Sequence, residues 1–446
     1  MKILILTTYY PPDTAIAAVR PYMFAKYLAG LGHEITVLRS GEIINNCEHY
    51  FDDVPAVRVI SYLGENSAAE AFERGEWKQS ENDGESRLSF LPERIRLPIA
   101  RFYHWIMQSR EAEQRIERRK ANFQKQKEAL DRLKREGCSF DVVFSTYGEL
   151  ENIFGGQYAA KIFDCKLIQD FRDAVAPSHS LRGKMLKKMM QVQIEAVGQA
   201  DAVTAVSHGL MQYLYHSEEK NCPQMVLHNG YEPVDGIQSR CVDVSDSGLF
   251  TMCYTGQLYV GLSDFYPILA ALKVLEDKKK IDLSNVRFHY AGPDFASLND
   301  VAKSLQLNEI LVDHGYVSRS EAARIQSSSD IFTVLSWNTA ASQGILTGKF
   351  YEGIRAGKPI LSIVSGDVPH SELDLLNETY HYGFCYESCR EKEQFQQLCD
   401  FLCDAYTQKM EKGYIEYHPN PALFTDFRYD VLATKLSNLC VKLVKE

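Results

Sequence analysis

The chain alternates short apolar runs with segments of helical spacing, and this alternation constrains its fold more than any other feature. The first apolar run covers residues 2–8, and apolar residues then recur at helical spacing over 20–31. A second apolar run follows at 35–38. A strand, a helix and a strand in this order open a doubly wound parallel sheet. The pattern starts again at Phe250, so we predict an α/β protein with two doubly wound domains.

Length and composition agree with this prediction. At 446 residues the chain is too long for one ordinary hydrophobic core and fits two domains. A net charge of −10 argues against general nucleic-acid binding. No apolar run is long enough to span a bilayer. The first apolar segment is too short for a secretion signal, and we interpret it as a strand. Eleven cysteines without such a signal imply a reducing compartment, so we expect a cytoplasmic protein.

Two cysteine pairs, Cys385/Cys389 and Cys399/Cys403, raise the question of a metal site, because each pair is four residues apart. No histidine pair with ligand spacing accompanies them. We therefore interpret these cysteines as small apolar residues on helix faces, and we expect no metal.

The stretch from Ser342 to Leu361 carries the strongest functional signal. It predicts a polar loop, a helix over 347–356 that ends at Gly357 and Pro359, and a short buried strand. The N-terminus of such a helix binds anions, because its free N–H groups and its dipole both favour negative charge. Lys349 falls in the first turn, where a bound anion would offset its unfavourable interaction with the dipole.

Glu352 lies three residues after Lys349, so the sequence places both side chains on one side of the helix. A carboxylate there can accept hydrogen bonds from a sugar diol. The alternative interpretation is a surface helix with a solvated Lys/Glu pair, since such pairs are common and weak.

This stretch resembles the donor-binding segment of the family 4 retaining glycosyltransferases, which have the two-Rossmann architecture called GT-B. The resemblance is to the bacterial surface-polysaccharide branch and extends over most of the chain. The matching residues are Gly344, Ile345, Lys349, Glu352, Gly357, Lys358, Pro359, Ile360 and Leu361. The resemblance implies that a nucleotide sugar contacts Gly344, Ile345, Leu346, Thr347, Lys349 and Glu352.

Other parts of the chain extend the resemblance. The N-terminal half keeps Pro11, Pro12, Arg20, Gly32 and His33 of the family's opening, but has alanines where the family has a glycine pair. The tip Asp170-Phe171-Arg172-Asp173 resembles an element that faces the sugar, and it implies catalytic roles for Arg172 and Asp173 beside Lys349. The alternative is an Asp–Arg pair that only fixes a loop.

In the second half, strands are expected over 250–256, 286–292 and 311–317. The resemblance implies donor contacts at their ends, through Gly256, Gly292, Tyr316 and Val317. Gln257, Leu262 and Ser263 stand where the family usually carries a base, and Gly344 stands in place of a glutamate. The loss of one charge-assisted contact to a diphosphate costs roughly 1.5–3 kcal/mol.

The sequence predicts three parts. An N-terminal, acceptor-side domain covers 1–235 and contains a basic helical insertion at about 64–135; a nucleotide-sugar domain covers 248–425; and a helix at 426–446 crosses back. Within the insertion, residues 94–135 hold 13 Lys/Arg and five Asp/Glu by our count, interleaved with aromatic residues. This composition favours contact with an anionic membrane surface. The alternative is a helix packed on the sheet with a solvated basic face.

Together these features predict a GT-B fold, two Rossmann-like domains facing a central cleft, and a retaining, hexosyl-type glycosyltransferase. The resemblance implies a nucleotide diphosphate sugar as donor, a glycan or lipid-linked acceptor, a role in polysaccharide biosynthesis, and no cofactor. Two alternatives stay open: a catalytically impaired, nucleotide-sugar-binding partner subunit, and an inverting GT-B enzyme or sugar epimerase.

Overall fold

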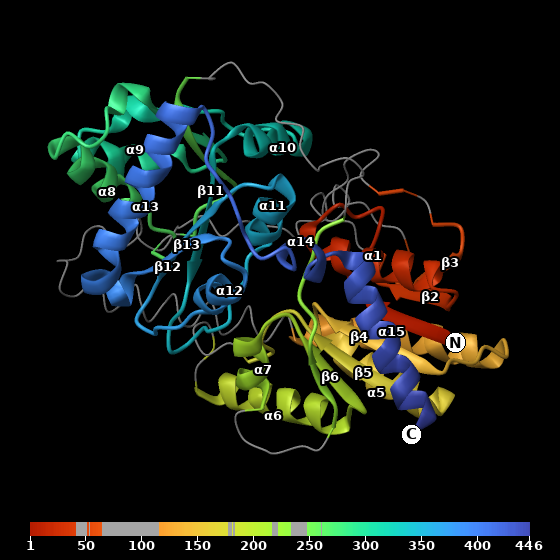
Figure 1. Ribbon diagram of the computed structural model, residues 1–446. Coiled ribbons are helices and arrows are strands. Elements are labelled where there is room, and N and C mark those ends of the chain that lie inside the picture. Colours follow the sequence, from red (N-terminus) through yellow and green to blue (C-terminus); the bar gives the residue numbers. More distant parts are fainter. Residues whose placement is uncertain are drawn as a thin grey trace. The chain divides into compact units, whose positions relative to one another are not determined.

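The computed structural model describes residues 1–41, 51–52, 54–64, 116–176, 181, 183–215, 222–232, 248–259 and 261–446 (Figure 1). The chain divides into two compact units. Unit 1 comprises Met1–Ala205, Leu214–Leu227 and Ala433–Glu446, and unit 2 comprises Val206–Tyr213 and His228–Leu432. The predicted basic insertion lies for the most part outside the described residues, and only its last part, 116–135, is described, as a helix.

Unit 1 is built on a seven-stranded sheet in the order β3-β2-β1-β4-β5-β6-β7, and all strand pairs are parallel. The strands are β1 (Lys2–Thr7), β2 (Glu34–Arg39), β3 (Val57–Ser61), β4 (Val142–Tyr147), β5 (Lys166–Phe171), β6 (Ala202–Ala205) and β7 (Gln224–Val226). Most are almost fully buried, as expected for a parallel sheet covered on both faces.

Unit 1 contains α1 (Ile16–Gly30), α5 (Leu150–Phe163), α6 (Gly183–Gln199) and the helix at 116–135. Helix α7 (His208–Leu214) belongs to unit 2 except for its last residue. Helix α1 packs against β1, β2 and β3, and α5 packs against β4 and β5. The chain leaves β1 toward β2 and β3 and returns to β4, so the carboxyl ends of β1 and β4 flank a topological switch point.

Unit 2 contains a six-stranded parallel sheet in the order β10-β9-β8-β11-β12-β13. Its strands are β8 (Phe250–Thr255), β9 (Val286–Ala291), β10 (Leu311–Asp313), β11 (Ile331–Trp337), β12 (Ile360–Ser365) and β13 (Gly383–Glu387). Its helices are α8 (Tyr266–Asp277), α9 (Phe295–Ser304), α10 (Arg319–Ser328), α11 (Gly348–Ala356), α12 (Glu372–Tyr380), α13 (Glu391–Lys412) and α14 (Leu423–Asp426). Two separate hydrophobic clusters cover the two faces of this sheet.

The predicted helix and strand of the organising stretch are present as α11 and β12. Helix α11 ends at Gly357, whose φ of 68° is the left-handed conformation that glycine adopts at helix ends. Gly353 lets the helix pack tightly, because a Cβ atom there would come within 2.9 Å of both Phe332 and Ile360. The helix therefore has one fixed position on the sheet, and that position sets where Lys349 points.

The last helix, α15 (Tyr429–Lys445), belongs to unit 2 up to Leu432 and to unit 1 from Ala433. Its start is tied within unit 2, where the backbone N–H of Tyr231 donates to Phe427 and that of Tyr429 donates to Tyr231, at 3.0 and 3.1 Å. Among the helices in the described ranges, none is long and apolar enough to cross a bilayer.

Two predictions of local structure are wrong. The strand expected over 311–317 ends at Asp313, because the side chain of Asp313 accepts a hydrogen bond from the Gly315 N–H at 2.8 Å and turns the chain. Of the four cysteines expected on helix faces, Cys385 lies buried on β13 instead, and Cys389 lies exposed on the short 3₁₀ helix Ser388–Arg390. Cys399 and Cys403 lie on α13.

Candidate functional site

The carboxyl edge of the unit 2 sheet has a switch point between β8 and β11. The chain runs from β8 outward to β9 and β10, and then returns to place β11 on the other side of β8. In open α/β sheets, ligands bind outside the carboxyl ends of the strands at such a point. Gly256 follows β8 directly, and the connection from β11 leads to the N-terminus of α11. The structure thus brings predicted donor residues from both halves of unit 2 to one edge.

Gly256 and Lys349 are in direct contact across this edge. Gly256 has a φ of 139°, and a Cβ atom there would lie 2.6 Å from Lys349 Cε. The turn is fixed because the Gly256 N–H donates to the Ala291 carbonyl at 2.7 Å, and the Tyr290 hydroxyl donates to the Gly256 carbonyl at 3.1 Å. Only glycine lets the lysine side chain lie against the backbone here.

Lys349 and Glu352 form the pair that the sequence predicts. Lys349 Nζ lies 3.2 Å from both carboxylate oxygens of Glu352. Glu352 Oε2 also accepts a hydrogen bond of 2.7 Å from Gln326, which is buried on α10 and donates to Thr255 as well. The pair is therefore not an isolated solvated one. Its side chains are 24% and 29% exposed, which leaves the ammonium group accessible to an anion.

Among the residues that the structure describes, no side chain caps the N-terminus of α11. Thr347 occupies the N-cap position, but its side chain makes no capping hydrogen bond, and no acidic residue lies in the first turn. Within the part of the chain that the structure describes, the buried Thr347 Oγ1 has no hydrogen-bond partner. The first N–H groups of α11 are thus not used by a side chain, as an anion site requires.

The residues before Thr347 are held mainly through their backbone. The Ser336 hydroxyl donates to the Ile345 carbonyl at 2.9 Å, and the Leu346 side chain is buried in the core. Gly344 adopts a φ of 69°, and a Cβ atom there would lie 2.6 Å from both Ser207 Oγ and the Leu210 nitrogen. A glutamate cannot fit at this position, which gives a packing reason for the departure from the family pattern.

The other predicted donor residues are distributed differently. Gly292 lies directly beneath the Gly256 turn, where a Cβ atom would meet the Tyr290 hydroxyl at 2.7 Å, so its small size serves the turn. Tyr316 is 90% exposed beyond β10. Val317 packs against the hydrophobic cluster that contains Phe350 and Tyr351.

In unit 1, the tip after β5 contains two different kinds of residue. Asp170 is fully buried and forms an ion pair with Arg20 at 2.7 Å, and it also accepts hydrogen bonds from Thr146 and Thr204. It is therefore structural. Asp173, in contrast, is exposed, and within the described ranges no hydrogen bond or ion pair holds its carboxylate.

Arg172 stands between these two roles. Its guanidinium donates to the carbonyls of Ala17 and Tyr147, at 2.7 and 3.2 Å, and it lies 5.9 Å from the centre of the Tyr9 ring. These contacts link Arg172 to the first turn of α1 and to the last residue of β4. Arg172 therefore has a structural role within unit 1, and the exposed Asp173 follows it directly in the sequence.

A buried charged cluster that was not predicted from the sequence lies after the carboxyl end of β4. Arg119, from the helix at 116–135, forms ion pairs of 3.0 Å with both Glu149 and Glu151. Tyr9 donates to Glu149 at 3.1 Å, and burial, followed by the Glu149 charge, raises the pKa of the Tyr9 phenol. Two glutamates directly after a predicted strand were the available signal.

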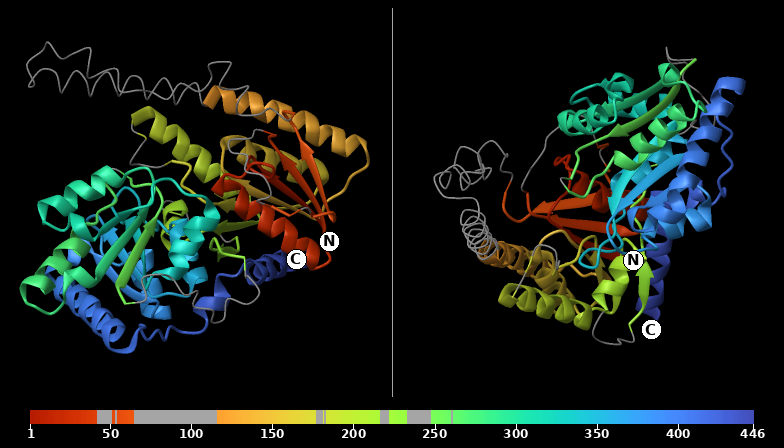
Figure 2. Two further views of the ribbon diagram at one scale, coloured as in Figure 1. Left: turned by 90° about the horizontal axis from the view of Figure 1, so that it is seen from above. Right: turned by 90° about the vertical axis from the view of Figure 1, so that its left-hand side faces the viewer.

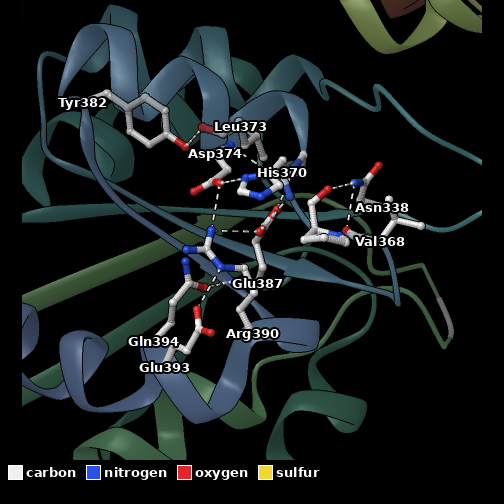
Figure 3. Close-up of polar contacts among 12 residues, drawn as sticks. Asn338, Val368, His370, Leu373, Asp374, Tyr382, Glu387, Arg390, Glu393 and Gln394 are labelled. Carbon is white, nitrogen blue, oxygen red and sulfur yellow. Dashed lines mark hydrogen bonds and ion pairs between the residues drawn. The ribbon is translucent and has the colours of Figure 1, made fainter.

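The polar contacts around the connection between β12 and α12 were also not predicted from the sequence. Side chains from two other parts of unit 2 hydrogen-bond to the backbone of this connection (Figure 3). Asn338 donates to the Val368 carbonyl at 2.9 Å. The buried Glu387 accepts hydrogen bonds from the N–H groups of His370 and Ser371, at 3.0 and 2.7 Å. Arg390 lies 3.1 Å from Asp374, and burial together with the Glu387 charge raises the pKa of that aspartate.

This held connection leads to Glu372, which is 2% exposed at its side chain. Its carboxylate accepts hydrogen bonds from the N–H groups of His208 and Gly209, at 3.0 and 3.2 Å. Two groups in the described ranges could supply metal ligands, His208/His228/Glu372 and His370/Asp374/Glu378. In both groups a carboxylate is already engaged by protein donors.

No model of a protein family matches the chain, and no curated protein matches its sequence. Solved structures do match. Sucrose-phosphate synthase from Thermosynechococcus elongatus has a TM-score of 0.60 at 11% identity, with 99% of each chain covered. The lipopolysaccharide outer core galactosyltransferase WaaB in its apo form has a TM-score of 0.55 at 12% identity, again with 99% of each chain covered.

A third match is described as "Trehalose-6-phosphate from E. coli bound with UDP-2-fluoro glucose". It has a TM-score of 0.57 at 10% identity and covers 100% of this chain and 99% of its own. Identities this low establish the fold alone. With the two parallel sheets, they confirm the predicted α/β fold class of GT-B type, with two doubly wound Rossmann-like units.

Proposed function

We propose that the protein is a glycosyltransferase that moves a hexose from a nucleotide diphosphate sugar to a glycan or lipid-linked acceptor. The observation that carries this proposal is the placement of Lys349 and Glu352 beside Gly256 at the switch point of unit 2. The donor in the E. coli structure, UDP-2-fluoro glucose, has the chemistry that this arrangement suits. The proposal includes retention of configuration, which is inferred from the sequence resemblance.

In the proposed complex, the donor diphosphate lies at the N-terminus of α11. The free N–H groups of its first turn and the Lys349 ammonium supply positive charge, and they stabilise the leaving diphosphate as the glycosidic bond breaks. Glu352 is oriented by Gln326, and its carboxylate accepts hydrogen bonds from sugar hydroxyls. Gly344, Ile345, Leu346 and Thr347 contribute backbone groups.

The acceptor side of the proposed enzyme lies in unit 1. Asp173 is the exposed carboxylate at the end of β5, and it contacts the acceptor; Arg172 is a positioning residue for this tip. A donor phosphate oxygen takes the acceptor proton in this mechanism. The protein therefore needs no nucleophile of its own, and it acts through positioning and electrostatics.

A membrane-linked acceptor fits the charge of unit 1, and we propose reversible association with an anionic inner membrane face. Arg94, Arg96 and Arg101 of the predicted basic segment lie outside the described residues. The helix at 116–135, orange in Figure 2, continues that segment. Its exposed basic residues are Arg118, Lys120, Lys125, Arg132, Lys134 and Arg135.

Helix α6 adds to this charge. Lys184, Lys187 and Lys188 are exposed on it, beside the half-buried Met185 and Leu186. The pKa of Glu117, on the helix at 116–135, is lowered mainly by Lys120 and to a smaller extent by the charge of Lys188. Bases near partly exposed apolar side chains suit an anionic lipid surface, where each well-placed base contributes about 1 kcal/mol.

One specific observation favours a second function, that of an inactive nucleotide-sugar-binding subunit. At the turn after β8, Gln257 accepts a hydrogen bond from Tyr254 through its carbonyl, and Ser263 accepts one from the Tyr259 N–H. Neither side chain supplies the positive charge that the family pattern has at this turn, and this loss favours an inactive subunit. If the protein is an enzyme, catalysis depends on the positive charge of Lys349 instead.

The test is a thermal-shift screen with UDP, GDP, ADP and dTDP sugars, followed by donor hydrolysis with analysis of the product anomer. We expect stabilisation by one class of donor and release of the sugar with its anomeric configuration retained. Binding without any turnover, with acceptor lipids present, would support the partner subunit. Inverted product would refute the retaining mechanism, and no binding would refute both functions.

A further inference from the structure

Two aromatic side chains meet at the switch point of unit 2, and the functions assigned above use neither of them. Tyr259 lies in the connection after β8, and Trp337 ends β11. Their ring centres are 5.2 Å apart and their planes make an angle of 59°. Tyr259 is 52% exposed, so much of this corner of aromatic surface is open to solvent.

Both rings are held in place by polar contacts. The indole N–H of Trp337 donates to Ser342 Oγ at 3.2 Å, and Ser342 forms two backbone hydrogen bonds of 3.0 Å with Thr339. The N–H of Tyr259 donates to Ser263 Oγ at 2.9 Å, and its carbonyl accepts from the N–H groups of Leu262 and Ser263. A pre-formed surface of this kind loses little conformational entropy when a ligand binds.

The aromatic corner belongs to the same edge as the cation. Tyr259 shares the connection after β8 with Gly256, against which Lys349 packs. Trp337 is the last residue of β11, directly before the connection to α11 that contains Gly344, and the neighbouring Ser336 donates to the Ile345 carbonyl. A ligand whose diphosphate lies at Lys349 therefore has these two rings within the loops that surround it.

We propose that Tyr259 and Trp337 form the surface on which the pyranose ring of the donor sugar packs. This inference rests on the proposed function and deepens it. A pyranose has an apolar face of C–H bonds and a rim of hydroxyl groups, and the electron-rich face of an aromatic ring attracts such C–H bonds. Ligand sites combine apolar and aromatic walls with a few placed polar groups in this way.

The geometry favours a sugar over a nucleobase at this corner. A flat base stacks on one ring plane, whereas two rings inclined at 59° offer one face and one edge to a puckered ring. The two rings also lie near the turn where Gln257 and Ser263 replace the basic side chains of the family pattern. In the proposed site, packing of the sugar on the rings takes the place of the ion pair that a basic side chain would form with the diphosphate.

The test compares sugar nucleotides with their nucleoside diphosphates. The probes are UDP-glucose, GDP-mannose, ADP-glucose and dTDP-rhamnose, each measured by calorimetry beside the diphosphate it contains. We expect Tyr259→Ala to weaken binding of the preferred sugar nucleotide about tenfold and to change binding of its diphosphate less than twofold. Tyr266→Ala is the matched control, because Tyr266 is 50% exposed on α8 and should alter neither.

Trp337→Phe provides a second variant that keeps an aromatic ring and the fold. The chain has three tryptophans, Trp77, Trp105 and Trp337, so intrinsic fluorescence can report on this one. The preferred sugar nucleotide should change the fluorescence of the wild type, its diphosphate should not, and Trp337→Phe should abolish the change.

Four results would overturn the inference, and the last of them would also refute the proposed function. Equal weakening of the diphosphate by Tyr259→Ala would place the base or diphosphate on these rings, and unchanged binding of both ligands would remove the rings from the site. A wild type that binds the diphosphate as tightly as the sugar nucleotide would also contradict the sugar subsite, while leaving nucleotide binding intact. A wild type that binds no probe would refute the proposed function as well.

Discussion

Lys349 reaches the edge of the sheet only because residue 256 has no side chain. A Cβ atom at Gly256 would come within 2.6 Å of Lys349 Cε, and the turn beneath is pinned by Ala291 and Tyr290. The position of the Lys349 ammonium group, the cation of the proposed donor site, therefore depends on Gly256, a residue far from it in sequence. This relationship explains why the glycine at the end of β8 and the lysine on α11 belong to one functional unit.

We expect Gly256→Ala to weaken binding of the preferred nucleoside diphosphate about tenfold, or about 1.4 kcal/mol. The added methyl group displaces Lys349 without removing its charge. Gly261→Ala is the control, because Gly261 has a φ of 74° in the same connection but no atom of the described residues lies within 4 Å of its Cβ position. Both variants lose stability through left-handed backbone strain. If calorimetry shows equal dissociation constants for Gly256→Ala and Gly261→Ala, Gly256 does not set the position of the Lys349 side chain.

The two aspartates of the tip after β5 should behave oppositely. Asp173→Asn should lower turnover and leave the melting temperature and nucleotide affinity unchanged, since Asp173 is exposed. Asp170→Asn should instead destabilise the protein by about 3–5 kcal/mol, because it leaves the buried Arg20 without its partner charge. Urea unfolding and donor turnover measure the two effects. Unchanged turnover in Asp173→Asn would make the whole tip structural.

Asp374 should contribute a pH dependence to stability. Burial and the Glu387 charge raise its pKa in the folded state, so folding favours the protonated form. Its contribution is most favourable below the ordinary aspartate pKa and is lost as pH rises through the raised value. The stability of the wild type relative to Asp374→Asn should therefore fall with rising pH across this window. A flat difference between the wild type and Asp374→Asn across this window would contradict the raised pKa.

The proposed membrane surface can be tested by charge reversal. Changing Lys184, Lys187 and Lys188 to Glu should reduce co-sedimentation with anionic liposomes, as should Arg94, Arg96 and Arg101 to Glu, and added salt should weaken binding of the wild type. A triple change of Lys278, Lys279 and Lys280 on unit 2 is the matched control, since it alters net charge equally. Wild-type protein that stays in the supernatant at low salt would refute the membrane role.

The parts of the site that could be predicted from sequence are the local ones. Gly357, Pro359 and the apolar run after them define the end of α11 and the start of β12. Helical geometry alone places Lys349 and Glu352 together. Regular strands could be predicted because a buried parallel strand is a short apolar run.

The contacts that could not be predicted join distant segments. The approach of Gly344 to Gly209, and the acceptance of two α7 N–H groups by Glu372, depend on tertiary packing that no spacing reveals. Helix α12 is short and its apolar pattern is weak, although Ser371 with Asp374 three residues later is a local N-cap signal. The Arg119 ion pairs likewise appear only after folding.

If a nucleoside diphosphate binds at the N-terminus of α11 through Lys349, removal of that ammonium group must weaken binding. Calorimetry with the tightest-binding of UDP, GDP, ADP and dTDP compares the wild type, Lys349→Ala and the exposed control Lys303→Ala. We expect the dissociation constant to rise at least about tenfold in Lys349→Ala and to stay unchanged in Lys303→Ala. Equal dissociation constants in all three proteins would show that Lys349 does not hold the diphosphate.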